Sequence, residues 1–124
     1  MKKSKRVLVV DDDKQLLKQL EKQLKEKGYE VSVAANGKEA LKKAEKETPD
    51  VITLDVMMPE MDGYETCFHL KENPGTNKIP VIMLTSRGKM KAKLASFSFG
   101  ADYYIAKPFE VEELVDLMEK ALAA

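Results

Sequence analysis

The stretch Val7-Leu8-Val9-Val10-Asp11-Asp12-Asp13 places four consecutive apolar residues directly before three carboxylates. An unbroken, β-branched apolar run of this length is typical of a strand that is buried on both faces of a sheet. Such strands belong to parallel sheets covered by helices, and the ligands of these sheets bind beyond the carboxyl ends of the strands. The stretch therefore predicts an α/β protein with an acidic site at the end of its first strand.

Outward from this stretch, short apolar runs alternate with longer segments of helical period. The further expected strands are Tyr29–Ala34, Val51–Leu54, Pro80–Leu84 and Tyr103–Ala106. The expected helices run from Asp13 to Gly28, from Asn36-Gly37 to Thr48, from Gly63 to Glu72, from Met90 to Phe99, and from Pro108 onward. This alternation implies right-handed crossovers and a parallel sheet. We therefore expect a doubly wound (βα)5 three-layer sandwich, because a closed eight-fold barrel needs about 250 residues.

Length and composition restrict the classes of protein that fit. A chain of 124 residues, 44% hydrophobic and 34% charged, suits one globular domain and argues against disorder. Lys plus Arg and Asp plus Glu both number 21, so bulk charge favours neither nucleic acid nor membrane as a partner. The single cysteine, Cys67, forms no internal disulfide and fits a reducing compartment. The basic start precedes only four apolar residues, too few for a signal peptide, so a cytoplasmic protein is expected.

Polar residues follow four of the five expected strands. They are Asp11 and Asp12 after the first strand, Asp55 after the third, Thr85 and Ser86 after the fourth, and Lys107 after the fifth. Because parallel strands end at the same edge of a sheet, these side chains are expected to meet there. Neighbouring carboxylates recruit a cation, and a set of oxygen ligands without His or Cys favours Mg²⁺ or Mn²⁺ over zinc. Asp13 and Asp62 are predicted as helix N-caps instead.

With these residues identified, the chain resembles the receiver domains of two-component response regulators. The resemblance rests on Val7–Asp13, on Asp55-Val56-Met57-Met58-Pro59-Glu60-Met61-Asp62-Gly63, on Thr85-Ser86 and on Gly100–Phe109. It covers essentially the whole chain, so residues 1–124 are expected to form a single receiver domain. It implies a flavodoxin-like (CheY-like) fold with the strand order 2-1-3-4-5.

The resemblance also implies a role for each residue at the sheet edge. Asp55 is the expected phosphoacceptor, which takes a phosphoryl group from the phosphohistidine of a sensor histidine kinase or a phosphotransfer protein. Asp12, Asp55 and the backbone carbonyl of Met57 are expected to bind Mg²⁺ directly, and Asp11 through water. Thr85 and Lys107 are expected to contact phosphoryl oxygens. A carboxylate nucleophile and charge neutralisation by a cation and a lysine agree with this chemistry.

A switch and an output surface are implied as well. Thr85 and Tyr104 are the expected switch pair, and the bond between Lys107 and Pro108 is expected to be cis. The helix at residues 90–99, the strand Tyr103–Ala106 and the last helix form the expected output face for a downstream target or output domain. The resemblance implies no direct binding of nucleic acid or membrane, and a monomer or a weak phosphorylation-dependent dimer. Its only expected catalysis is its own phosphorylation and dephosphorylation.

Access to the phosphoryl group is expected to depend on three residues near it. Met57 and Arg87 lie two positions beyond Asp55 and Thr85, where side chains shield the phosphoryl group from water. Ser86 is small and leaves a path to the acceptor. Neither Met57 nor Arg87 positions water as an acid or amide does, so slow self-hydrolysis is expected, with Met57→Asn or Met57→Glu changing its rate.

Two other readings of the chain stay open at this point. A pseudo-receiver has the same fold without phosphorylation, and the intact Asp12, Asp55, Thr85 and Lys107 argue against it. A phosphatase of the haloacid dehalogenase type has its nucleophile after the first strand and a second acidic motif late in the chain. Here only Glu110, Glu112 and Glu113 follow Lys107, and they resemble first-turn helix residues. The chain fits either a stand-alone regulator or one module of a longer protein.

Four further features have competing interpretations. Tyr104 is either a switch or a half-buried packing residue, and the adjacent Tyr103 has no assigned effect on switching. Phe68 is either an exposed contact or the sign of a rotated helix. His69 is expected to be a solvated helix residue and not a phosphorelay histidine. The basic stretch with Arg87, Lys89, Lys91 and Lys93 is either a solvated helix face or a docking patch for an acidic partner.

Overall fold

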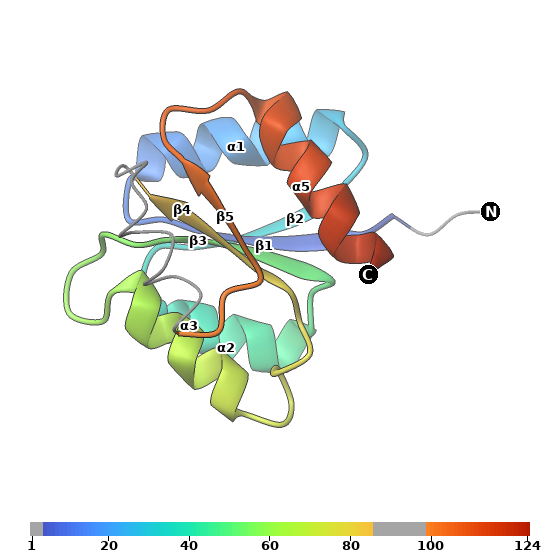
Figure 1. Ribbon diagram of the computed structural model, residues 1–124. Helices are drawn as coiled ribbons and strands as arrows, with labels where there is room; N and C mark the ends of the chain where they lie inside the picture. The colour runs from blue at the N-terminus through green and yellow to red at the C-terminus, as the bar shows by residue number, and fades with distance from the viewer. Residues whose placement is uncertain (1–3, 86–98) are drawn as a thin grey trace.

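The computed structural model describes residues 4–85 and 99–124. Its sheet has five parallel strands in the order β2-β1-β3-β4-β5, as predicted. They are β1 (Arg6–Val10), β2 (Glu30–Ala34), β3 (Val51–Asp55), β4 (Val81–Thr85) and β5 (Tyr103–Ala106). The helices α1 (Lys14–Glu26) and α5 (Val111–Ala123) cover one face of the sheet, and α2 (Gly37–Glu47) and α3 (Gly63–Glu72) cover the other (Figure 1). The expected α/β three-layer sandwich is confirmed.

The core lies on both faces of the sheet because the central strands have apolar side chains on both sides. In β1, Val7 and Val9 pack in the cluster beneath α1 and α5, whereas Leu8 and Val10 pack in the cluster beneath α2 and α3. All residues of β3 and β4 are buried. The apolar runs in the sequence therefore correspond to strands that are buried on both faces, as predicted.

Several predicted boundaries were wrong by one to three residues. The N–H of Tyr29 donates to the carbonyl of Leu24 and closes α1, so β2 begins at Glu30. β4 begins at Val81 and not at Pro80, which has no N–H for the sheet. The last helix begins at Val111 and not at Pro108.

The start of α5 is set by two glutamates. The N–H of Glu110 donates to Glu113 Oε1 at 3.0 Å, which satisfies a donor at the helix start and lets the helix begin one residue later. The Lys107–Pro108 peptide bond upstream is cis, as predicted. Of the expected helix at Met90–Phe99, residues 90–98 lie outside the described residues, and Phe99 lies in a turn.

The predicted N-caps are confirmed. Asp13 Oδ1 accepts from the N–H groups of Gln15 and Leu16 at 3.0 and 3.2 Å. Asp62 Oδ1 accepts from the N–H of Glu65 at 2.9 Å. These two aspartates therefore stabilise helix starts and are separate from the acidic cluster described below. Among the described residues, no helix has the length and hydropathy of a membrane-spanning segment.

Replacing Thr53 by Val is expected to raise the free energy of unfolding by about 1 kcal/mol, because Thr53 Oγ1 is fully buried and has no hydrogen-bond partner among the described residues. Thr66 provides a matched control: it is equally buried, and its Oγ1 donates to the carbonyl of Asp62 at 2.8 Å. Thr66→Val is expected to lower the same free energy by about 1 kcal/mol. Urea denaturation measures both changes, and destabilisation by Thr53→Val would contradict the prediction.

Candidate functional site

Three of the four predicted strand ends place buried polar residues at one edge of the sheet. Asp11 follows β1, Asp55 ends β3 and Thr85 ends β4, with exposed fractions of 1%, 5% and 2%. Lys107 follows β5, and its N–H donates to the carbonyl of Thr85 at 2.6 Å. β3 and β4 each extend one residue further than predicted, so Asp55 and Thr85 are held by the last pairs of the sheet. The pairing of the strands therefore fixes where the backbones of Asp55 and Thr85 lie at this edge.

Lys107 joins the two buried carboxylates of this edge. Its Nζ lies 2.9 Å from Asp11 Oδ2 and 2.9 Å from Asp55 Oδ1. The second oxygen of Asp11, Oδ1, accepts from the N–H of Asp13 at 2.9 Å. Asp11 thus ties the ammonium group to the loop after β1, and Lys107 neutralises part of the negative charge around Asp55.

The three predicted aspartates also form a candidate metal centre. One carboxylate oxygen each from Asp11, Asp12 and Asp55 lies within 4.8 Å of the others. Asp12 is exposed, whereas the other two are buried. An all-oxygen set that opens to solvent on one side fits a hard divalent cation such as Mg²⁺, which keeps several of its waters. The donor set therefore fits the predicted ion.

Burial and neighbouring charges change the pKa values of Asp55 and Lys107. The pKa of Asp55 is raised from 3.8 to about 6: burial is the main cause, Asp11 and Asp12 add to the rise, and Lys107 opposes it. Burial alone would lower the pKa of Lys107, but its hydrogen bonds to Asp11 and Asp55 outweigh burial and raise it. Lys107 is therefore charged at neutral pH, and a cation near Asp55 favours its ionised form.

The loop between β3 and α3 carries the predicted access residue Met57. Its side chain is 60% exposed to solvent, two residues after Asp55 at the end of β3. Met58 is buried in the core beneath α2 and α3. Binding of a cation by the Met57 carbonyl stays a prediction. Ser86 and Arg87, together with Lys89, Lys91 and Lys93, lie outside the described residues.

Tyr103 and Tyr104 lie on opposite faces of the sheet. Tyr104 is half-buried and packs against the cluster beneath α2 and α3, on the same face as Met83, which it pairs in β4. Tyr103 packs against the cluster beneath α1 and α5. The two rings therefore have different surroundings, and the switch role of Tyr104 stays a prediction.

The remaining candidates lie away from the acidic edge. Phe68 is 43% exposed on α3 and meets the ring of His69 edge-on, with 5.8 Å between ring centroids. His69 is exposed, as predicted. Cys67 is buried, and burial raises its pKa to about 11, so it is an unreactive thiol in the core.

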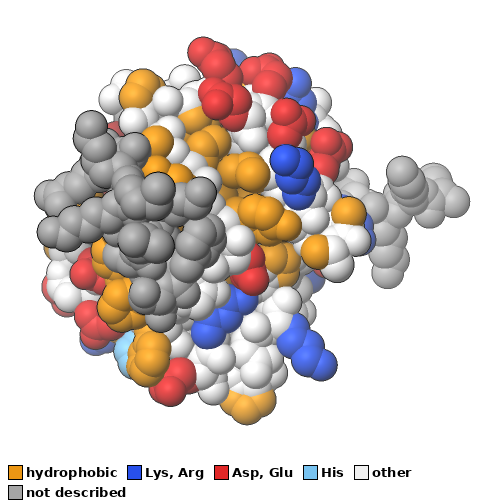
Figure 2. All heavy atoms as spheres, in the orientation of Figure 1, with side chains coloured by type: hydrophobic (Ala, Val, Ile, Leu, Met, Phe, Trp, Pro, Cys, Tyr) orange, Lys and Arg blue, Asp and Glu red, His pale blue; other side chains and the backbone are white. Residues whose placement is uncertain are grey.

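The described part of the expected output face is acidic. Red side chains gather over α5 in Figure 2, and the exposed acids of this helix are Glu112, Glu113, Asp116 and Glu119. The basic stretch that was interpreted as a solvated helix face or a docking patch, Arg87 and the three lysines after it, lies outside the described residues.

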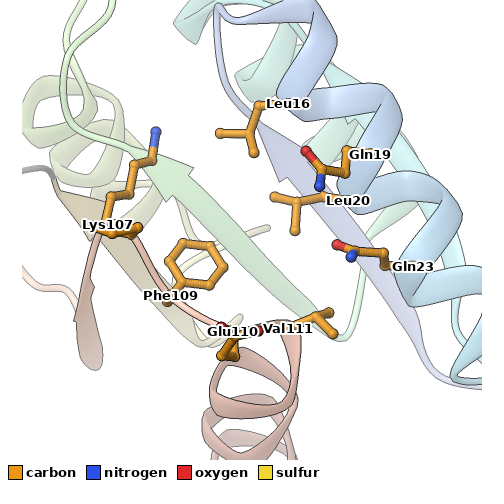
Figure 3. A pocket seen from close by; sticks show the side chains of 9 residues that line it. Leu16, Gln19, Leu20, Gln23, Lys107, Phe109, Glu110 and Val111 are labelled. Atoms are coloured by element: carbon orange, nitrogen blue, oxygen red, sulfur yellow. The ribbon is translucent and has the colours of Figure 1, made fainter.

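The sequence did not predict a groove of about 640 Å³ beside Lys107. In Figure 3, Leu16 and Leu20 of α1 face Phe109 across it, and the amides of Gln19 and Gln23 project from α1 into it. Apolar residues four apart on a helix normally indicate core contact, so periodicity alone gave no signal for an open groove.

Comparisons with known proteins show the family to which the chain belongs. Residues 7–119 match the family model described as the response regulator receiver domain. The chain is 42% identical over 111 residues to the alkaline phosphatase synthesis transcriptional regulatory protein PhoP of Bacillus subtilis (strain 168), covering 90% of this chain and 45% of that relative. The chain thus spans about half the length of the curated relatives that it matches.

Solved structures of response regulators and receiver domains share the fold of this chain. The chemotaxis response regulator CheY4 of Vibrio cholerae is 35% identical with a TM-score of 0.91, over 97% of this chain and 100% of that chain. The receiver domain of the sensor histidine kinase PA1611 from Pseudomonas aeruginosa PAO1 is 26% identical with a TM-score of 0.90, over 98% and 100% of the two chains. That structure has a magnesium ion coordinated in its active site cleft.

Proposed function

The chain belongs to the family of response regulator receiver domains of two-component systems, and from this premise we propose that it is a phosphoacceptor switch whose acceptor is Asp55. One observation carries the proposal: Lys107 Nζ lies 2.9 Å from an oxygen of Asp55, inside a cluster of three carboxylates. The proposed nucleophile thus has a fixed positive charge at hydrogen-bond distance and belongs to a carboxylate cluster whose oxygens lie within 4.8 Å of one another.

The proposed reaction transfers a phosphoryl group from a phosphohistidine to Asp55. A carboxylate oxygen of Asp55 forms a bond to phosphorus while the bond from phosphorus to the histidine nitrogen breaks, and the nitrogen keeps the electron pair. The product is an acyl phosphate, which water later hydrolyses back to the carboxylate. Phosphoryl transfer depends mainly on charge neutralisation and positioning, and Lys107 supplies a charge that is already in place.

A divalent cation is part of the proposal. Mg²⁺, with Mn²⁺ as a substitute, would be held by Asp12 and Asp55, the Met57 carbonyl and, through water, Asp11. When bound, it neutralises charge on the transferred phosphoryl oxygens. The magnesium ion in the similar receiver domain of PA1611 supports this choice of metal. The hydroxyl of Thr85 and the ammonium of Lys107 would contact the remaining phosphoryl oxygens.

Signalling partners complete the proposal. The donor is a sensor histidine kinase or a phosphotransfer protein in the cytoplasm, and the output passes through Thr85 and Tyr104 to β5, α5 and residues 90–98. The phosphorylated domain acts on a downstream target or an output domain. Its oligomeric state is a monomer or a weak phosphorylation-dependent dimer. Apart from its own phosphorylation and dephosphorylation, the domain catalyses nothing. Met57, Ser86 and Arg87 control how water reaches the acyl phosphate.

Incubation with acetyl phosphate and Mg²⁺ is expected to add one phosphoryl group to the protein, detected by intact mass. EDTA is expected to prevent the addition, and so is Asp12→Ala, because Asp12 is the exposed carboxylate of the candidate metal centre. The Asp12 variant is also expected to unfold at a higher temperature, since one of three repelling carboxylates is gone. Uptake in EDTA, or continuous release of phosphate from p-nitrophenyl phosphate as in a phosphatase, would contradict the proposal.

A further inference from the structure

The first residue of α3 lies directly against the backbone of Asp55. A Cβ atom placed on Gly63 would lie 2.2 Å from the carbonyl oxygen of Asp55, 2.9 Å from its carbonyl carbon and 2.8 Å from Cα of Val56. All three are backbone atoms, so no side chain can rotate away to make room. The N–H of Gly63 donates to the carbonyl of Val56 at 2.9 Å. The absence of a side chain at residue 63 therefore permits this contact.

The first turn of helix α3 is stabilised by bonds that do not involve Asp55. Asp62 caps its first turn through Glu65 N, and Thr66 Oγ1 donates to the carbonyl of Asp62 at 2.8 Å. A Cβ on residue 63 would therefore meet the Asp55 peptide from a helix start that is already hydrogen-bonded.

Asp55 is held from the opposite side as well. The N–H of Val56 donates to the carbonyl of Leu84 in β4 at 3.0 Å, and the Asp55 carboxylate is bonded to Lys107. A displacement of the Asp55 peptide therefore moves the carboxylate relative to Lys107 and the other two aspartates. Misplacement of a reacting group by about 1 Å is enough to slow a reaction by about 100-fold.

We infer that Gly63 is a positioning residue for the acceptor: by leaving room for the Asp55 carbonyl, it sets where the Asp55 carboxylate stands relative to Lys107. The inference rests on the proposed function, since positioning matters only if Asp55 receives the phosphoryl group. It assigns to residue 63 an effect on reactivity that is separate from its effect on stability.

Gly37 offers a closely matched control. Each glycine is the first residue of a helix, is buried and follows an N-cap residue, Asn36 for Gly37 and Asp62 for Gly63. A Cβ on Gly37 would meet only side-chain atoms among its three nearest neighbours, and none of them belongs to Asp55. Gly37→Ala therefore reproduces the crowding at a helix start without touching the acceptor.

The test compares Gly63→Ala, Gly37→Ala and the wild type in phosphorylation by acetyl phosphate at saturating Mg²⁺. The rate constant is divided by the folded fraction from circular dichroism. Gly63→Ala is expected to reduce it at least about 10-fold and Gly37→Ala to leave it unchanged. Fluorine-19 NMR of the beryllofluoride complex gives a second readout, because the fluorine shifts report the geometry around Asp55 and are expected to change only in Gly63→Ala.

If Gly63→Ala is unfolded in buffer, the same measurements are made in trimethylamine N-oxide, which favours the compact state. A folded Gly63→Ala with the wild-type rate constant and fluorine shifts would overturn the inference, and so would equal losses in both variants. Absence of uptake by the wild type would instead contradict the proposed function, so the two failures are distinguishable.

Discussion

Asp55→Asn is expected to abolish phosphoryl uptake from acetyl phosphate completely. The amide has no ionised oxygen to attack phosphorus, and the neighbouring carboxylates are poor substitutes. Asp11 is 1% exposed with both oxygens already bonded, and among the described residues Lys107 forms its ion pairs with Asp11 and Asp55 and not with Asp12. Intact mass after incubation with acetyl phosphate and Mg²⁺ measures the loss.

Asp62→Asn is the matched control for this change. Asp62 caps α3 from an exposed position, and Asn is as good an N-cap as Asp, so uptake is expected to stay at the wild-type level. Uptake by Asp55→Asn equal to that of the wild type would assign the acceptor to another residue.

The stability of Asp55→Asn separates lost chemistry from lost structure. Because the folded pKa of Asp55 is about 6 and its ordinary value is 3.8, the folded state binds the proton more tightly than the unfolded state. The raised pKa of Asp55 therefore stabilises the folded state fully below pH 3.8, and this contribution to the free energy of unfolding is lost as the pH rises through about 6. Asn does not ionise, so the variant is expected to be at least as stable as the wild type at pH 7.5. Thermal unfolding between pH 4 and pH 8 checks this sign.

Lys107→Met is expected to lower the free energy of unfolding by about 3 kcal/mol at neutral pH, because it leaves two buried carboxylates without their cation. The difference in free energy of unfolding between the wild type and Lys107→Met is expected to decrease as the pH falls below the pKa of Asp55, because the protonated carboxyl carries no charge for the ammonium group to neutralise. Added Mg²⁺ is expected to offset part of the loss. Urea denaturation at pH 5 and pH 7.5, with and without Mg²⁺, measures all three effects.

Lys27→Met is the control for the loss of an ion pair. Lys27 Nζ lies 3.5 Å from Glu112 Oε2, and both side chains are well exposed, so the change is expected to cost at most about 0.5 kcal/mol at either pH. Equal losses in the two lysine variants, or a deficit in Lys107→Met that grows as the pH falls, would contradict the assigned role of Lys107.

Local sequence patterns were sufficient for the fold and for the composition of the site. Apolar runs such as Val7–Val10 are readable as buried strands because both of their faces need apolar cover. Five such runs alternating with helices indicate a parallel sheet, and the strands of a parallel sheet end at one edge. The sequence alone therefore predicts that Asp11, Asp55 and Lys107 lie close together. The caps at Asp13 and Asp62 are equally local, since each satisfies N–H groups two or three residues away.

Element ends were less predictable because neighbouring contacts compete for them. Tyr29 is aromatic and suits a strand, but its N–H closes α1 instead. Pro108 suits the first turn of a helix, yet the paired glutamates Glu110 and Glu113 start α5 further along. In both cases a hydrogen bond outweighed the conformational preference of the residue.

By itself, the sequence determined the α/β class, the parallel sheet and the residues at its edge, because these follow from periodicity and from the ends of strands. Only the tertiary structure decided that Lys107 bridges Asp11 and Asp55, which are 96 and 52 positions away, and that Gly63 lies on the carbonyl of Asp55. It also decided which core cluster each face of β5 meets, so that Tyr104 packs beneath α2 and α3 and Tyr103 beneath α1 and α5. Such contacts depend on how helices and loops of particular length return the chain to the sheet, and no local pattern encodes that geometry.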